Sequence, residues 1–372
     1  MAAKDQLLGW DVSPYTVKVK SYFNFKKIPY DYKPPNVYTL SRKVQPAAGK
    51  IIMPTVFRAN GTMVQDSSVI IDVYEADCKE PAVIPETPDQ AFASLLVELF
   101  ADEWMPLAAL HYRWNYPGNY DFILGEFGKN ALPGFPGFIQ RAAVRKFARK
   151  LSGYLPILGV TKNMEPALEA AAEELLGLLD HHFKEHPFLL GGQPTIGDFA
   201  LYGPLYAHMD RDPEPRNLIR KYDHLYRWLM VMHGNFDNSV ANGAGDLLPN
   251  DEIPDSLLAV LHYISELHSP LLQQTIAGIR EWDQKNPDIG KLPSRLGQAS
   301  ISIKGVTETR YNLTYSYWMI QRIRDKVKAR GGADSLIEAL NLGDIFIQPL
   351  PIEVSLERTR LYRIPGPVPE PI

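Results

Sequence analysis

The chain has 372 residues, of which 45% are hydrophobic and 22% charged, a balance that is typical of a folded protein of two or three domains and that excludes a disordered or fibrous one. With 43 acidic and 39 basic residues the net charge is −4, so nucleic acid is not an expected partner and an anionic membrane would need a local basic patch. The single cysteine, Cys78, excludes an intrachain disulfide and favours a cytoplasmic location, and no segment has the roughly 18 successive apolar residues of a membrane span.

The first 80 residues mix short apolar runs with helical spacing, which predicts a small α/β domain. The predicted elements are, in chain order, a strand at 6–10, a helix from 15, a strand at 28–32, two hairpin strands at 54–58 and 62–65, and a helix at 67–75. Pro14 suits the first turn of its helix, and Asn60-Gly61 is a strong hairpin signal.

Three prolines, Pro81, Pro85 and Pro88, mark a connection after which helical patterns dominate. Helices are predicted at 89–112, 138–151, 166–182 and 195–208, which indicates a second, all-helical domain. A polar, glycine-rich stretch at 234–255 is typical of a linker or lid. Beyond it we predict helices at 254–286 and 309–328, an isolated strand around 299–303, and an extended proline-rich tail at 364–372.

The segment Ser13-Pro14-Tyr15-Thr16 lies between a predicted strand and a predicted helix, where the helix N-terminus presents unpaired N–H groups and a partial positive charge. A thioredoxin fold has its Cys-x-x-Cys at this point. With Ser13 and Thr16 in the two cysteine positions, the chain cannot exchange disulfides itself. The Ser13 hydroxyl can still stabilise the thiolate of another molecule.

Three further motifs follow along the chain. Met53-Pro54 opens a strand, Asp66-Ser67-Ser68 opens a helix, and the segment 188–200 contains Thr195 and Asp198, whose side chains can cap a helix reciprocally. Together with residues 13–16, these motifs closely resemble the glutathione transferase superfamily, serine type. The resemblance implies an α+β multidomain protein, with a thioredoxin-like domain at 1–80, an all-helical domain at 88–235 and a mostly helical C-terminal extension at 236–372.

Carried over residue by residue, the resemblance implies a glutathione site in the first domain. Ser13 would be the catalytic hydroxyl that hydrogen-bonds the glutathione sulfur, because the tyrosine-type classes have their tyrosine in the slot of Gly9. The glutathione-binding residues would be Tyr15, Lys50, Met53, Pro54, Asp66 and Ser67.

Each of these binding residues has an implied part. Pro54 would be the family's cis proline, and Met53 would present its backbone to the cysteinyl part of glutathione. Asp66 and Ser67 would hold the γ-glutamyl end. Lys50 is separated from Pro54 by three residues, whereas the family often has the lysine that grips the glycyl carboxylate just before its proline strand.

An aromatic-rich region near the start of the second domain is where the family builds its electrophile pocket, with ordinary core packing as the alternative. The candidate pocket residues are Trp104, His111, Tyr112 and Trp114. A face made by Tyr311, Tyr315, Trp318 and Arg322 is expected to be a packed helical face. No metal is expected, because no metal-ligand motif accompanies the histidines at 181, 182 and 186.

A basic stripe is predicted on one helix of the second domain. It either faces solvent, pairs with the acidic helix at 165–180, or binds an anion. The residues of this stripe are Arg141, Arg145, Lys146, Arg149 and Lys150.

The function that the resemblance favours is a glutathione-dependent transferase or lyase. Glutathione would be the co-substrate, and a small hydrophobic electrophile the second partner. The alternatives are a non-catalytic glutathione- or ligand-binding protein, used for carriage, sensing or assembly, and a glutathione-using isomerase or peroxidase. The family implies a homodimer, and the extension is expected to be either a lid over the electrophile site or an oligomer and partner surface.

Overall fold

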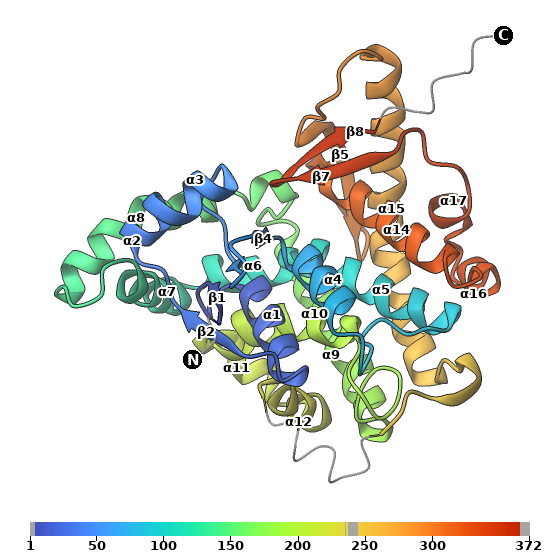
Figure 1. Ribbon diagram of the computed structural model, residues 1–372, viewed down its shortest axis with the longest axis horizontal. Helices are drawn as coiled ribbons and strands as arrows, with labels where there is room; N and C mark the ends of the chain where they lie inside the picture. Colours follow the sequence, from blue (N-terminus) through green and yellow to red (C-terminus); the bar gives the residue numbers. More distant parts are fainter. Residues whose placement is uncertain (1–3, 235, 237–244, 365–372) are drawn as a thin grey trace.

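The computed structural model describes residues 4–234, 236 and 245–364. Figure 1 shows the chain running from a small α/β unit through a helical region to a C-terminal region of helices and hairpins. Almost all of the predicted proline-rich tail lies outside the described residues, as does the middle of the predicted linker.

The N-terminal unit has a four-stranded sheet with the strand order β2-β1-β3-β4. Strand β1 pairs in parallel with β2 and antiparallel with β3, which pairs antiparallel with β4. The elements are β1 (Asp5–Leu8), α1 (Pro14–Phe25), β2 (Tyr30–Lys33), α2 (Val37–Thr39), α3 (Gln45–Ala48), β3 (Thr55–Phe57), β4 (Met63–Gln65) and α4 (Ser67–Asp77). The predicted order of strands and helices is confirmed, and the fold is thioredoxin-like.

The second unit is helical throughout. Its elements are α5 (Pro88–Glu103), α6 (Pro106–Asn115), α7 (Pro117–Ala131), α8 (Gly137–Ser152), α9 (Glu165–Glu185), α10 (Ile196–Pro204), α11 (Pro213–Ile219) and α12 (Asp223–Met232). The single helix predicted at 89–112 is wrong, because Pro106 lacks an N–H group and starts a new helix after a break at Trp104 and Met105. Helix α7 was not predicted, and its three glycines weaken the helical signal.

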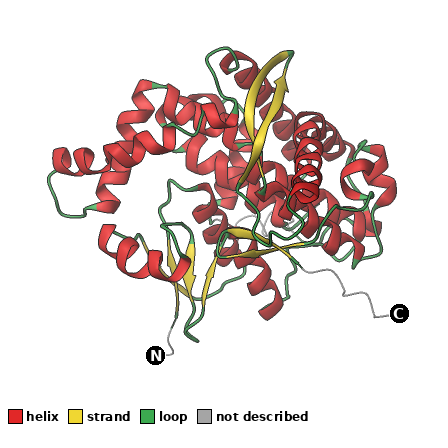
Figure 2. Ribbon diagram, turned by 90° about the horizontal axis from the view of Figure 1, so that it is seen from above, coloured by secondary structure: helices red, strands yellow, loops and turns green. Residues whose placement is uncertain are grey.

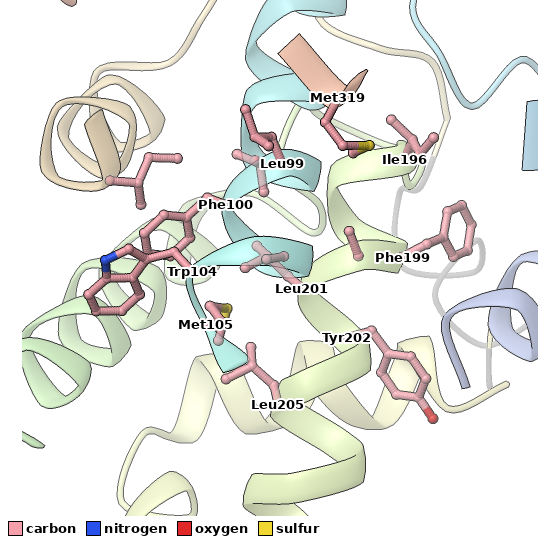
Figure 3. Packing of buried hydrophobic residues seen from close by; sticks show 14 of the residues in the cluster. Leu99, Phe100, Trp104, Met105, Ile196, Phe199, Leu201, Tyr202, Leu205 and Met319 are labelled. Carbon is pink, nitrogen blue, oxygen red and sulfur yellow. The ribbon is translucent and has the colours of Figure 1, made fainter. Parts of the chain in front are cut away.

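Helix α10 lies at the centre of this unit and is packed against α5 and α1. The Thr195 backbone N–H donates to Oδ2 of Asp198 at 2.8 Å, so the predicted reciprocal cap is confirmed. Figure 3 shows apolar side chains of α10 facing those of α5, with Met319 of the C-terminal region beside Leu99. The core therefore continues from the helical unit into the C-terminal region.

The C-terminal region is mostly helical, with two hairpins. Its elements are α14 (Asp255–Lys285), β5 (Arg295–Ile303), β6 (Val306–Leu313), α15 (Tyr315–Lys328), α16 (Asp334–Ala339), α17 (Gly343–Phe346), β7 (Val354–Glu357) and β8 (Arg360–Arg363). Figure 2 shows the paired strands β5 and β6 as a long ribbon well away from the N-terminal sheet. Helices α14 and α15 pack against α5.

Two expectations for this region are wrong. The strand predicted at 299–303 is not isolated, because β5 pairs antiparallel with β6 across a turn in which Lys304 and Gly305 have positive φ angles. The helix predicted at 309–328 begins only at Tyr315, so Tyr311 lies on a strand and does not share a helical face with Tyr315. Within the described ranges, no helix combines the length and the apolar character needed to cross a bilayer.

Candidate functional site

Two adjoining cavities lie beside the N-terminus of α1. The larger has a volume of about 690 Å³ and a mostly apolar wall, and the smaller has a volume of about 250 Å³ and a wall with three carboxylates. Tyr15, Ile52 and Met53 line both cavities. The two cavities are therefore adjacent at these three residues.

Ser13 lines the larger cavity close to this junction. It is the N-cap of α1, with extended backbone angles, and its Oγ accepts a long hydrogen bond of 3.4 Å from the Thr16 N–H. Accepting this bond leaves the hydroxyl proton free to be donated to a ligand. A side chain at Gly9 would meet Thr16 at 2.4 Å, so the close contact between β1 and α1 excludes a tyrosine in that slot.

The Met53–Pro54 peptide bond is cis, as expected. Met53 lies before β3 at the junction of the cavities, and its backbone has no hydrogen-bond partner among the described residues. Lys50 lines the larger cavity, and its ammonium group has no partner in the described part of the chain. Partial desolvation lowers the pKa of Lys50, and the positive charge of Arg360 adds to this effect.

The smaller cavity is built on the N-terminus of α4. Asp66 has a φ angle of +77°, and its Oδ1 accepts from the N–H groups of Ser68 and Val69 at 3.0 and 3.2 Å. Its Oδ2 accepts a hydrogen bond of 2.6 Å from the hydroxyl of Tyr315, the first residue of α15. Asp66 is therefore both a helix cap and a wall of the cavity.

Asp102 and Glu103 of α5 complete the acidic wall. Burial raises the pKa of Asp102 to about 6, although Lys18 lies 2.6 Å from its Oδ2. Burial also raises the pKa of Glu103 to about 8, although the Ser316 hydroxyl donates to it at 2.8 Å. Glu103 is therefore mostly neutral at pH 7.

Behind this wall lies a buried network that joins all three units. Glu98 lies between Lys18 of α1 and Arg322 of α15, at 2.8 and 2.6 Å. Burial alone would raise the pKa of Glu98, but the two cations lower it to about 2. Arg322 also pairs with Asp72 of α4 at 2.7 Å. The C-terminal region thus supplies a cation that the buried carboxylate of α5 requires.

Tyr15 lines both cavities but does not have a free hydroxyl. Its O–H donates to the backbone carbonyl of Asp102 at 3.0 Å. Burial, with Glu103 and Asp102 nearby, raises the pKa of Tyr15 well above its usual value. The ring of Tyr15 can contact a ligand, whereas its hydroxyl is held by the protein.

Of the four residues predicted for the electrophile pocket, Trp114 lines the larger cavity, and the other three lie elsewhere. Trp104 is buried and stacks on Phe100, and His111 donates or accepts at 2.7 Å with Glu169 of α9. Tyr112 stacks on Tyr116. The side of α6 that faces the cavity is formed by Pro106, Leu110, Arg113 and Trp114, which recur at helical spacing, whereas His111 and Tyr112 lie on another side.

The apolar wall also contains residues that the sequence did not indicate. They come from the loop after β1, from α7 and α8, and from the turn after α8, and are Trp10, Phe127, Phe147, Leu151 and Tyr154. Apolar spacing marks α8 as amphipathic, but nothing local indicates that its apolar side closes a cavity.

Two stretches of the chain, one in the N-terminal unit and one in the helical unit, match known domain models. The model of the glutathione S-transferase N-terminal domain matches residues 7–82, and the model of the C-terminal domain of the same family matches residues 161–229. The chain therefore belongs to the glutathione S-transferase superfamily. No curated protein sequence matches it.

Several solved structures resemble the chain at low identity. A glutathione S-transferase from Rhodospirillum rubrum F11 is 14% identical, with 69% of this chain and 99% of that chain covered and a TM-score of 0.40. A glutathione S-transferase from Methylobacterium radiotolerans, solved with glutathione sulfonate, is 17% identical, with 68% of this chain and 99% of that chain covered and a TM-score of 0.40. The β-etherase LigF from Sphingobium sp. strain SYK-6 is 14% identical, with 64% of this chain and 100% of that chain covered and a TM-score of 0.45.

The smaller cavity of this glutathione S-transferase superfamily member has unpaired polar groups. The Ser67 hydroxyl, which lines this cavity, has no hydrogen-bond partner among the described residues. In the first turn of α4, the N–H groups of Ser68 and Val69 are bonded to Asp66, which leaves the N–H of Ser67 for a carboxylate. The acidic wall offers charge to an ammonium group. These groups suit the amino-acid end of a peptide. In the described ranges, no cluster of histidine, cysteine, aspartate and glutamate is suited to a metal.

The extension does not cover the larger cavity. None of the residues that line that cavity comes from the C-terminal region, whereas Tyr315 lines the smaller one. Of the two alternatives for the extension, a lid over the larger cavity is not seen in the described part of the chain. The C-terminal region closes the opposite end of the site, because α15 packs across α4 and α5.

Proposed function

We propose that this chain is a glutathione-dependent transferase or lyase in which Ser13 activates the glutathione thiol. The observation that supports this most is the position of Ser13 beside the junction of a polar and an apolar cavity. The γ-glutamyl end would occupy the smaller cavity at Asp66 and Ser67. The cysteinyl part would lie against Met53, and the sulfur would reach the Ser13 hydroxyl.

The chemistry is energetically sufficient with these groups. Lowering a thiol pKa by two units requires a preference for the thiolate of about 2.7 kcal/mol. A hydrogen bond to a charged group contributes about 1.5–3 kcal/mol, and a helix N-terminus about 0.3–1 kcal/mol. The free proton of Ser13 and the N-terminus of α1 are together enough. Among the described residues, no acidic side chain lines the larger cavity to oppose the thiolate.

The apolar wall of the larger cavity favours a hydrophobic, aromatic-sized electrophile. The glutathione sulfur would form a bond to an electrophilic carbon, and the leaving group would depart with the bonding electron pair. The proton released by the thiol would pass to solvent. Lys50, which lines this cavity, would attract an anionic group such as the glycyl carboxylate.

The test is the ultraviolet thiolate absorbance of bound glutathione, titrated with pH, in three variants of Ser13. Ser13→Thr keeps the hydroxyl and the cap, Ser13→Asn keeps the cap without the hydroxyl, and Ser13→Ala removes both. The proposal predicts thiolate near neutral pH in the wild type and the threonine variant only. A full thiolate signal in the asparagine variant would exclude hydroxyl activation.

A non-catalytic glutathione-binding protein is the second candidate, and one contact favours it. The hydroxyl of Tyr315 is bonded to the Asp66 oxygen that an ammonium group of glutathione would approach. Calorimetric titration with glutathione separates the candidates when combined with an electrophile screen. Tight binding without thiolate and without turnover of any electrophile would support the binding protein.

The remaining assignments stay predictions. We propose the domain division 1–80, 88–235 and 236–372, a homodimer, and a cytoplasmic location, as the family and the composition imply. Light scattering on the purified full chain tests the homodimer, because a mass of 42.0 kDa would identify a monomer.

A further inference from the structure

Helices α7 and α8 form a hairpin that projects from the helical domain, at the left of Figure 1 and of Figure 2. The two helices approach closely where Gly128 of α7 lies against Gln140 of α8, since a Cβ at Gly128 would meet the Gln140 side chain at 2.7 Å. The match to the C-terminal domain model begins only at residue 161, after this hairpin. The hairpin therefore lies outside the matched residues.

The tip of the hairpin exposes large apolar side chains. Residues 133–139 are all exposed, and among them Phe135 is 54%, Phe138 75% and Ile139 38% accessible to solvent. Isolated exposed apolar residues are normal, but three within five positions form a patch that typically marks an interaction site. The tip contains no charged residue.

Next to the tip, α8 carries the basic stripe that the sequence indicated. Its five cations are exposed, α8 has no acidic residue, and none of the five side chains has an ion-pair or hydrogen-bond partner in the described part of the chain. Of the three alternatives for this stripe, pairing with the acidic helix is not seen among the described residues. On that helix, α9, Glu169 bonds to His111 and Glu174 pairs with Lys304 of the C-terminal region.

The hairpin is also a wall of the larger cavity. Phe147, Lys150 and Leu151, all on α8, line that cavity, so the base of the basic helix lies beside the proposed electrophile site. An apolar tip, a basic helix and an apolar cavity thus follow one another along a single projecting element.

We propose that the α7–α8 hairpin docks on an anionic phospholipid surface. The phenylalanines of the tip enter the interfacial region of the bilayer, and the cations of α8 lie at the lipid phosphates. A second copy of this chain is a poor occupant, because two α8 helices would bring ten like charges together. The interaction is peripheral and requires neither a spanning helix nor an active Ser13.

Docking in this orientation brings the larger cavity close to the lipid, so an apolar electrophile dissolved in the bilayer has a short path to it. This consequence, unlike the docking itself, rests on the proposed function.

The test is cosedimentation of the full chain with sucrose-loaded vesicles. One set contains phosphatidylcholine alone, and the other also contains roughly 30 mol% phosphatidylserine, which gives about the surface charge of a cytoplasmic leaflet. We expect at least about tenfold stronger partition to the anionic vesicles, falling with added salt. Each basic residue near such a surface contributes about fivefold, so Arg145→Glu with Arg149→Glu should weaken partition by about 25-fold or more. Phe135→Ser with Phe138→Ser should weaken it by about tenfold.

Matched controls lie on other surfaces of the molecule. Ile289→Ser removes an exposed apolar side chain, and Lys221→Glu with Lys328→Glu reverses two exposed charges, each outside the hairpin. These variants should bind vesicles as the wild type does. Because all substituted side chains are exposed, unchanged thermal melting is expected and identifies any variant that is misfolded.

Three results would overturn the proposal. They are equal partition to both kinds of vesicle, unchanged partition of the Arg145→Glu, Arg149→Glu variant, and the absence of vesicle binding together with binding of single-stranded RNA that the same variant abolishes. The last would identify a nucleic-acid surface instead. Glutathione titration is measured separately, so loss of the proposed catalysis and loss of docking are distinguishable.

Discussion

The hydroxyl of Tyr315 donates a hydrogen bond of 2.6 Å to Oδ2 of Asp66, 249 residues earlier in the chain. This bond joins the C-terminal region to the N-cap of α4, where the glutathione site is proposed. Burial raises the pKa of Asp66, and the bond from Tyr315 opposes that effect by favouring the charged carboxylate. The C-terminal region is thus a structural part of the site.

Tyr315→Phe should weaken glutathione binding by about 10- to 150-fold, because a hydrogen bond to a charged group contributes about 1.5–3 kcal/mol and holds Asp66 charged and oriented. Tyr311→Phe is the matched control, since Tyr311 lies on β6, is 39% exposed, and its hydroxyl has no hydrogen-bond partner among the described residues. Calorimetry measures both affinities. Tighter binding by Tyr315→Phe would show instead that Tyr315 competes with the ligand for Asp66.

Arg322→Met should lower the free energy of unfolding by about 3–5 kcal/mol, because it removes the partner of a buried carboxylate, Glu98. Lys326→Met, on the same helix, breaks a pair with Asp72 that is 26% exposed and should cost at most about 1 kcal/mol. Urea unfolding of both variants provides the comparison. Equal losses would contradict the role assigned to the buried network.

The ionisation of Glu103 should lower the free energy of unfolding as the pH rises from about 4.5 to 8. In the folded chain Glu103 has a pKa of about 8, against about 4.3 when unfolded. Between these two values the folded state keeps the proton that the unfolded state loses, so the stabilisation from Glu103 decreases as the pH rises through this window. Glu98 acts in the opposite direction, because its folded pKa of about 2 means that its contribution is lost as the pH falls below about 4.5.

Glu103→Gln should remove the part of this dependence that comes from Glu103. We expect the variant to be more stable than the wild type at pH 8, by roughly 1–3 kcal/mol, and no more stable at pH 4. Glu185→Gln, at the exposed end of α9, is the control and should leave the profile unchanged. Parallel profiles for the wild type and Glu103→Gln would show that Glu103 is ionised throughout.

Two alanine variants distinguish residues that line the larger cavity from residues of the packed aromatic cluster beside it. Phe147→Ala should raise KM for an apolar electrophile by about 3- to 10-fold with little loss of stability, because Phe147 lines the cavity and is 36% exposed. His111→Ala should instead lower stability by about 1–3 kcal/mol and leave kcat/KM within about twofold, because His111 is buried against Glu169. A larger kinetic effect of His111→Ala would place the electrophile on the other side of α6.

The sequence by itself determined the features that depend on neighbouring residues. The N-cap at Ser13, the cis bond before Pro54, the turn at Asp66 and the reciprocal cap of Thr195 and Asp198 each involve groups a few positions apart. Their geometry follows from local backbone preferences and short-range hydrogen bonds, so the motifs are readable in order along the chain.

Only the tertiary structure decided which distant groups meet. The side of α6 that faces the cavity depends on where α9 packs, so Trp114 lines the wall while His111 bonds to Glu169. The pairing of β5 with β6 replaced an expected isolated strand, and α15 placed Tyr315 on Asp66 and Arg322 on Glu98. These contacts join residues separated by up to 249 positions, and burial and charge pairing across such separations leave no local signal in the sequence.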